Sequence, residues 1–111
     1  MNTTAIGQRA EDTVADYLLR RKFQIITQNW RTRRCEIDII AYRHKVMYFV
    51  EVKYRKSATH GSGDEYITPT KLRQMQHAAQ LWIARHDWRG EYTLCVASMI
   101  GTGDVSWYEL S

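Results

Sequence analysis

The 111-residue sequence is poor in proline and cysteine and contains no long apolar run. Its one proline is Pro69, and its two cysteines, Cys35 and Cys95, lie far apart and form no CxxC motif, which excludes a disulfide framework. The four histidines lack the spacing of a zinc site. No stretch approaches the roughly 20 apolar residues of a membrane helix, and Met1 to Asp16 has no signal-peptide run. We therefore expect a cytoplasmic, reducing location and no membrane partner.

Hydrophobic residues make up 44% and charged residues 25% of the chain, which suits one domain over residues 1–111. Apolar residues recur at helical spacing from Thr4 to Arg21 and again from Pro69 to about His86, where Thr68 followed by proline is a helix start signal. Strand patterns cover residues 23–30, 36–42, 46–54, 92–100 and 105–110. The predicted fold class is α/β, with a mixed central sheet flanked by helices in the order α-β-β-β-α-β-β.

Positive charge exceeds negative charge only slightly, with 16 Lys and Arg against 12 Asp and Glu, for a net charge of +4. This excess permits a polyanionic partner without requiring one. Its placement is more informative, because the basic residues gather in four short groups at 20–22, 31–34, 43–45 and 53–56. A single group of this kind is usually a solvated face, but four groups around the same strands favour a nucleic-acid partner.

Charged residues interrupt two otherwise apolar strands. Successive side chains of a strand point to opposite faces, so Glu51 and Lys53 are predicted to share one face of strand 46–54. By the same alternation, Glu36 and Asp38 share one face of strand 36–42. The opposite face of that strand is then expected to carry Ile37, Ile39 and Ala41.

The connection between these two strands is short enough only for a hairpin. If its loop is His44-Lys45, Asp38 lies directly opposite Glu51, with Cβ atoms about 4.5–5.5 Å apart, where like charges destabilise the pair. A divalent cation would neutralise both carboxylates. A loop one residue longer would shift the pairing and leave them as near neighbours that are not opposed.

Lys53 adds an ammonium beside this carboxylate pair, where it would stabilise a phosphate or orient an attacking water. Asp38, Glu51 and Lys53 together predict a site for phosphodiester hydrolysis, with the two carboxylates as metal ligands. Glu11 on the first helix is a candidate further ligand or base. Each residue alone has an ordinary structural explanation, such as a surface ion pair.

Several motifs together give a resemblance to a known family. They are Gly7-x-x-x-Glu11-x-x-x-Ala15, Asn29-Trp30-Arg31, Glu36-Ile37-Asp38-Ile39-Ile40-Ala41, Phe49-Val50-Glu51-Val52-Lys53-Tyr54-Arg55 and Thr70-Lys71. Over residues 5 to 85 the chain resembles the YraN family of small bacterial proteins, which is similar to archaeal Holliday-junction resolvases and to PD-(D/E)XK nucleases. It departs from that pattern at Cys35, where glycine is usual, and in strand 92–100, which lacks an acidic residue.

The resemblance implies a restriction-endonuclease-like fold and a nuclease that cuts DNA, including branched or junction DNA, with Mg²⁺ or Mn²⁺. Asp38, Glu51, Lys53 and Glu11 match the family's functional positions, and a homodimer is plausible by analogy. The candidates for nucleic-acid binding are Arg31, Arg33, Arg34, Arg55, Lys56 and Lys71. Two alternatives remain open: a non-catalytic nucleic-acid-binding module, and a protein-interaction domain anchored by Trp30, Trp88 or Trp107.

Overall fold

The computed structural model describes residues 3–55, 67–101 and 104–110. These described residues form two helices and five strands in the predicted order, α-β-β-β-α-β-β. The elements are α1 (Thr3–Arg20), β1 (Gln24–Arg31), β2 (Glu36–Arg43), β3 (Val46–Arg55), α2 (Pro69–His86), β4 (Glu91–Ile100) and β5 (Val105–Glu109).

The second helix begins and ends where its sequence signals predict. The Thr68 hydroxyl accepts a hydrogen bond from the backbone N–H of Lys71, and Pro69 takes the first helical position, where its missing N–H costs nothing. Asp87 adopts a left-handed conformation with φ of 53° and ends the helix. The buried face of the helix consists of Met75, Ala78, Ala79 and Trp82, whereas the apolar Leu72 in its first turn is 37% exposed.

The strands form one mixed sheet in the order β1-β2-β3-β4-β5. β3 and β4 are parallel, and the other neighbours are antiparallel. The predicted two-residue loop between β2 and β3 is confirmed, with Arg43 paired to Val46. His44 and Lys45 both have positive φ, 53° and 68°, so the loop is a type I′ turn formed without the usual Asn-Gly.

Each face of the sheet packs against one helix. On one face, Val14 and Leu18 of α1 contact a cluster that contains Ile39, Val50 and Cys95. On the other face, Met75, Ala79 and Trp82 of α2 pack with Ile40, Phe49 and Leu94. Fully burying side chains of this size is worth about 1.5–3 kcal/mol each, so the central part of the sheet, between the helices, is the most strongly held.

The alternation of side chains along β2 breaks at Asp38, which corrects the face assignment made from sequence. Ile37 packs in the α2 cluster, whereas Ile39 and Ala41 pack in the α1 cluster. Two odd-numbered neighbours on opposite faces require a backbone irregularity between them. On the adjacent strand Asn29 has a φ of 55°, so both strands are distorted at this level.

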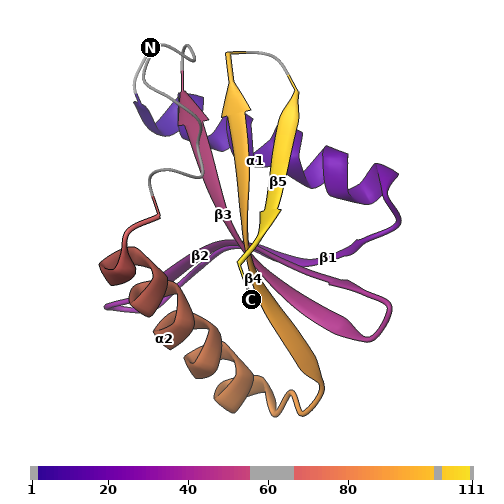
Figure 1. Ribbon diagram of the computed structural model, residues 1–111, viewed down its shortest axis with the longest axis vertical. Coiled ribbons are helices and arrows are strands. Elements are labelled where there is room, and N and C mark those ends of the chain that lie inside the picture. The colour runs from indigo at the N-terminus through magenta and orange to yellow at the C-terminus, as the bar shows by residue number, and fades with distance from the viewer. Residues whose placement is uncertain (1–2, 56–66, 102–103, 111) are drawn as a thin grey trace.

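The sheet also divides at Asp38. Paired residues of β2 and β3 extend from the turn only to Ile39 and Val50, although β3 continues to pair with β4 as far as Arg55. β2 continues to pair with β1 up to Glu36 and Arg31. Figure 1 shows β1 and β2 turning away from the other three strands. We call this opening between the start of β2 and the end of β3 the fork.

Candidate functional site

Asp38 lies at the base of the fork. One of its carboxylate oxygens, Oδ2, accepts a 2.8 Å hydrogen bond from the backbone N–H of Val52. The side chain therefore takes the place of a backbone carbonyl at the point where the strands part. Burial, followed by the nearby Glu51 carboxylate, raises the pKa of Asp38 to about 6. The strand pairing stops at Ile39 and Val50, so Asp38 and Glu51 are not the directly opposed pair expected from the loop length, but they are near enough for Glu51 to act on the pKa of Asp38.

Glu51 is half-buried on the face of the sheet that packs against α2. Its Oε2 atom lies 3.0 Å from the Nζ atom of Lys71, and the two side chains are only 18% and 30% exposed. Lys71 was predicted as a contact for nucleic acid, and the structure pairs it with Glu51. Its charge also favours the ionised form of Asp38. One ammonium is therefore shared electrostatically by both carboxylates.

Glu11 reaches the fork from the opposite side of the sheet, on α1. Its Oε1 atom is buried and has no hydrogen-bond partner, which is costly for a carboxylate oxygen. Burial, followed by the charge of Asp38, raises the pKa of Glu11 to about 7. Since an unpartnered buried oxygen favours a cation or proton nearby, Glu11 is well placed to serve the same centre as Asp38.

A chain of polar side chains joins α1 to β1 beside Glu11. Gln8 and Gln28 both donate hydrogen bonds to Oδ1 of Asp12, at 3.1 and 3.4 Å, and Asn29 donates to Gln8 at 3.3 Å. These bonds connect the helix turn that carries Glu11 to the distorted part of β1. They were not anticipated from the sequence, because the residues are separated by up to 21 positions.

Lys53 follows Glu51 by two residues along β3 and is half-buried. Strand alternation puts both side chains on the same face. Within the described part of the chain, the ion pair of Glu51 is made with Lys71 rather than with Lys53. Lys53 is therefore close in register to the carboxylates but is not their counterion in this structure.

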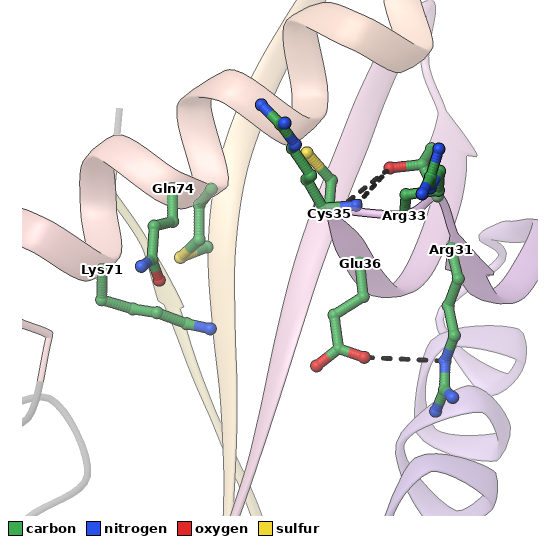
Figure 2. A pocket seen from close by; sticks show the side chains of 9 residues that line it. Arg31, Arg33, Cys35, Glu36, Lys71 and Gln74 are labelled. Carbon is green, nitrogen blue, oxygen red and sulfur yellow. Dashed lines mark hydrogen bonds and ion pairs between the residues drawn. The ribbon is translucent and has the colours of Figure 1, made fainter.

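A pocket of about 370 Å³ adjoins the fork between the β1–β2 connection and α2. Arg31, Arg33 and Arg34 line it from one side, and Lys71 and Gln74 line it from α2. Figure 2 shows Lys71 extending from α2 toward Glu36, with Gln74 beside it. Among the described residues that line the pocket, four are basic and Glu36 alone is acidic, which gives it an excess of positive charge.

The loop that carries these arginines has an ordered backbone. The Thr32 hydroxyl accepts hydrogen bonds from the backbone N–H groups of Arg34 and Cys35, at 3.3 and 3.1 Å. The N–H of Thr32 donates to the carbonyl of Cys35 at 2.8 Å. The threonine thus presents Arg33 and Arg34 from a tight turn. A Thr within a basic run is the signal that sequence analysis passed over.

Of the remaining predicted contacts for nucleic acid, Arg55 is half-buried at the end of β3. Its backbone carbonyl accepts a 2.7 Å hydrogen bond from Gly101. Lys56 lies outside the described residues.

The donor set at the fork suits a hard divalent cation. Among the residues that the structure describes, no three carboxylate, imidazole or thiolate side chains converge closely enough to hold a metal by themselves. Mg²⁺, however, is commonly bound by one or two carboxylates together with waters and substrate phosphate. Asp38 and Glu51 are the two carboxylates that would supply those oxygens. The residues present therefore fit such a cation.

Fold and site together define an α/β protein with a mixed five-stranded sheet, two flanking helices and an acidic fork beside a basic pocket. The chain belongs to a recognised bacterial family. The profile described as "Uncharacterised protein family UPF0102" matches residues 10–98, which confirms the predicted family membership. No helix among the described residues is long and apolar enough to cross a membrane.

Individual relatives agree with the family match. A UPF0102 protein of Geobacter sulfurreducens is 44% identical over 80 residues, covering 72% of this chain and 62% of that protein. One from Renibacterium salmoninarum is 40% identical, covering 73% and 69%. One from Vibrio campbellii is 33% identical over 108 residues, covering 94% and 88%. The aligned part therefore spans less than two thirds of the Geobacter relative but most of the Vibrio one.

Proposed function

We propose that this protein is a divalent-metal-dependent endonuclease that hydrolyses phosphodiester bonds in DNA, and that the fork is its active site. The observation that supports the proposal most is the electrostatic coupling of Asp38 to Glu51 at a break in the sheet. Two half-buried carboxylates from adjacent strands are costly for the fold unless a cation balances them. If that cation is Mg²⁺ or Mn²⁺, it would also bind the phosphodiester and take part in its hydrolysis.

In this proposal Asp38 and Glu51 hold the cation, with Val52 N–H fixing the orientation of the Asp38 carboxylate. The bound cation would polarise the phosphate and lower the pKa of an attacking water. Lys53 donates to a phosphate oxygen or to that water, and so stabilises charge that develops during attack. Glu11, whose pKa is raised to about 7, is suited to take a proton near neutral pH.

The basic pocket supports DNA as the class of substrate. Guanidinium groups bind phosphate oxygens with good geometry, and contacts to the backbone position a nucleic acid without reading its sequence. Arg33 and Arg34 project from an ordered turn next to the fork. This arrangement favours recognition of backbone shape, which agrees with branched or junction DNA as substrate.

The test is a cleavage assay on linear, single-stranded, flapped and four-way DNA with Mg²⁺ and with Mn²⁺. Asp38→Ala and Lys53→Met are expected to lower the cleavage rate by about 100-fold or more, because each removes a charge that acts on the transition state. Their affinity for DNA should change little. Asp16→Asn, at an exposed carboxylate of α1, is the matched control. Cleavage that persists in both site variants, with contaminants excluded, would refute the mechanism.

One observation favours a second candidate, a nucleic-acid-binding module without catalysis. Lys71 already neutralises Glu51 at 3.0 Å, so that carboxylate has a counterion without a metal. Calorimetry with Mn²⁺ separates the two functions. The nuclease should bind Mn²⁺ and lose that binding in Asp38→Ala, whereas the binding module should take DNA with no Mn²⁺ at the fork.

The third possibility, a protein-interaction domain, has less support. Trp30 and Trp88 pack against the α2-side cluster and Trp107 against the α1-side cluster, so these rings are engaged within the fold. The predicted homodimer and cytoplasmic location stay predictions.

A further inference from the structure

Lys71 belongs to two neighbouring places at once. Its ammonium pairs with Glu51 in the fork, and the same side chain lines the basic pocket beside Arg33, Arg34 and Gln74. Figure 2 shows it extending from α2 into that pocket. The residue therefore sits where a cation at the fork and a phosphate in the pocket would both act on it.

The position of Lys71 on α2 makes it dependent on an anion. It occupies the first turn of the helix, where its N–H is capped by Thr68. The first turn is the positive end of the helix dipole and disfavours an ammonium unless an anion lies close by. No acidic residue in that turn offers one, so the anion must come from elsewhere. In this structure it is Glu51, and a phosphate in the pocket would serve equally well.

Building on the proposed nuclease function, we propose that Lys71 is an exchangeable counterion that couples DNA binding to metal binding. In the free protein its ammonium neutralises Glu51. When a DNA phosphate enters the pocket, Lys71 pairs with that phosphate and leaves Glu51 to the divalent cation. Metal and DNA then bind with positive cooperativity, and the coupling is reciprocal.

The exchange follows from competition for one carboxylate. A cation that binds Glu51 must displace the ammonium 3.0 Å from its Oε2 atom, so a phosphate that draws Lys71 away removes part of the cost. Glu36, the one acidic side chain among the described residues that line the pocket, is already paired with Arg31 at 3.6 Å. Arg33, Arg34 and the displaced Lys71 are thus available together to a phosphate.

The test measures Ca²⁺ affinity by calorimetry and the affinity for a fluorescent DNA duplex by anisotropy, at constant ionic strength. Ca²⁺ takes the same kind of oxygen ligands as Mg²⁺. For the wild type we expect Ca²⁺ to tighten DNA binding about fivefold or more, a typical size for coupled sites. Lys71→Met should bind Ca²⁺ more tightly than the wild type without DNA, bind DNA more weakly, and lose most of the coupling.

Arg73→Met is the matched control, because Arg73 is an exposed cation on the same helix that does not line the pocket. It should keep the wild-type coupling. Glu51→Gln provides a second arm: by releasing Lys71 it should strengthen metal-free DNA binding, and this gain should vanish in the Glu51→Gln/Lys71→Met double variant. Glu36→Gln is the control for this arm. It also removes one negative charge, but its effect on metal-free DNA binding should not depend on Lys71.

Two results would overturn the exchange while leaving the nuclease proposal intact. One is wild-type coupling in Lys71→Met, and the other is weaker Ca²⁺ binding in that variant without DNA, which would make Lys71 a support for the cation. Failure of the nuclease proposal gives a different pattern. Ca²⁺ binding would then be unaffected by Asp38→Asn, and both proposals would fall together.

Discussion

The two ends of the β2–β3 hairpin are built from the same strands but follow different physical rules. In the turn half, residues 39–50, the strands pair regularly and bury large apolar side chains such as Ile40 and Phe49. In the fork half, residues 36–38 and 51–55, a carboxylate replaces a backbone partner and charged groups face one another. The comparison shows that regular pairing supplies the stability that allows the other end to hold unfavourable charges.

The largest expected effect comes from breaking the turn half. Phe49 is 2% exposed and makes edge-on contacts with Trp82 and Tyr92. Phe49→Ala should lower the free energy of unfolding by about 3–5 kcal/mol, because it removes buried surface and leaves a cavity. Chemical denaturation followed by circular dichroism measures this loss. A change below about 1 kcal/mol would contradict the idea that this half carries the stability.

Removing a charge from the fork half should raise the free energy of unfolding instead of lowering it. Asp38→Asn keeps an oxygen that accepts from Val52 N–H but removes a buried charge. Because burial and the nearby Glu51 carboxylate together raise the pKa of Asp38 from 3.8 to about 6, and one pKa unit is worth about 1.4 kcal/mol, ionising Asp38 in the folded protein costs about 3 kcal/mol. We expect Asp38→Asn to raise the free energy of unfolding by about 1–2 kcal/mol at pH 7.5, and to abolish metal binding and cleavage.

The pH dependence of this gain has a definite sign. Between about pH 4 and 6 the folded protein holds a proton on Asp38 that the unfolded chain has released, so wild-type stability falls as pH rises through that window. Below it, both states are protonated and the advantage of Asp38→Asn should disappear. Thermal unfolding at pH 3.5, 5 and 7.5 measures the trend. An advantage that grew on acidification would show that the Asp38 charge stabilises the fold.

The smallest effect is expected at the exposed edge of the fork. Arg31 and Glu36 form a 3.6 Å ion pair, but their side chains are 68% and 60% exposed. Exposed pairs of this kind contribute about 0–1 kcal/mol. Glu36→Gln should change the free energy of unfolding by less than about 0.5 kcal/mol, as measured by urea titration. A larger loss would mean that Glu36 helps to hold β1 and β2 together at the fork.

Much of the hairpin was predictable because its signals are local. The two-residue loop and the pairing of Ile40 with Phe49 follow from the length of the polar break between two strand patterns. The cap at Thr68 and Pro69 follows from the chemistry of helix starts. The order of elements followed from periodicity, and the proximity of Asp38 and Glu51 followed from the register.

Other features depend on groups that are distant in sequence. The reversal of faces at Asp38 accompanies a distortion at Asn29 on a neighbouring strand. The assignment of β2 side chains to faces from the sequence assumed a regular strand, so it could not foresee this reversal. The pairing of Lys71 with Glu51 joins α2 to β3 across 20 residues. Glu11 comes close to the fork only because of where α1 lies across the sheet.

The amino-acid sequence by itself therefore determined the elements, the hairpin and the identity of the charged residues, since each depends on interactions between near neighbours along the chain. Only the tertiary structure decided that the sheet divides at Asp38, that Lys71 neutralises Glu51 and that a basic pocket adjoins them. Those outcomes depend on burial and on the electrostatic field of groups from several elements, which come together only when the helices pack on the sheet.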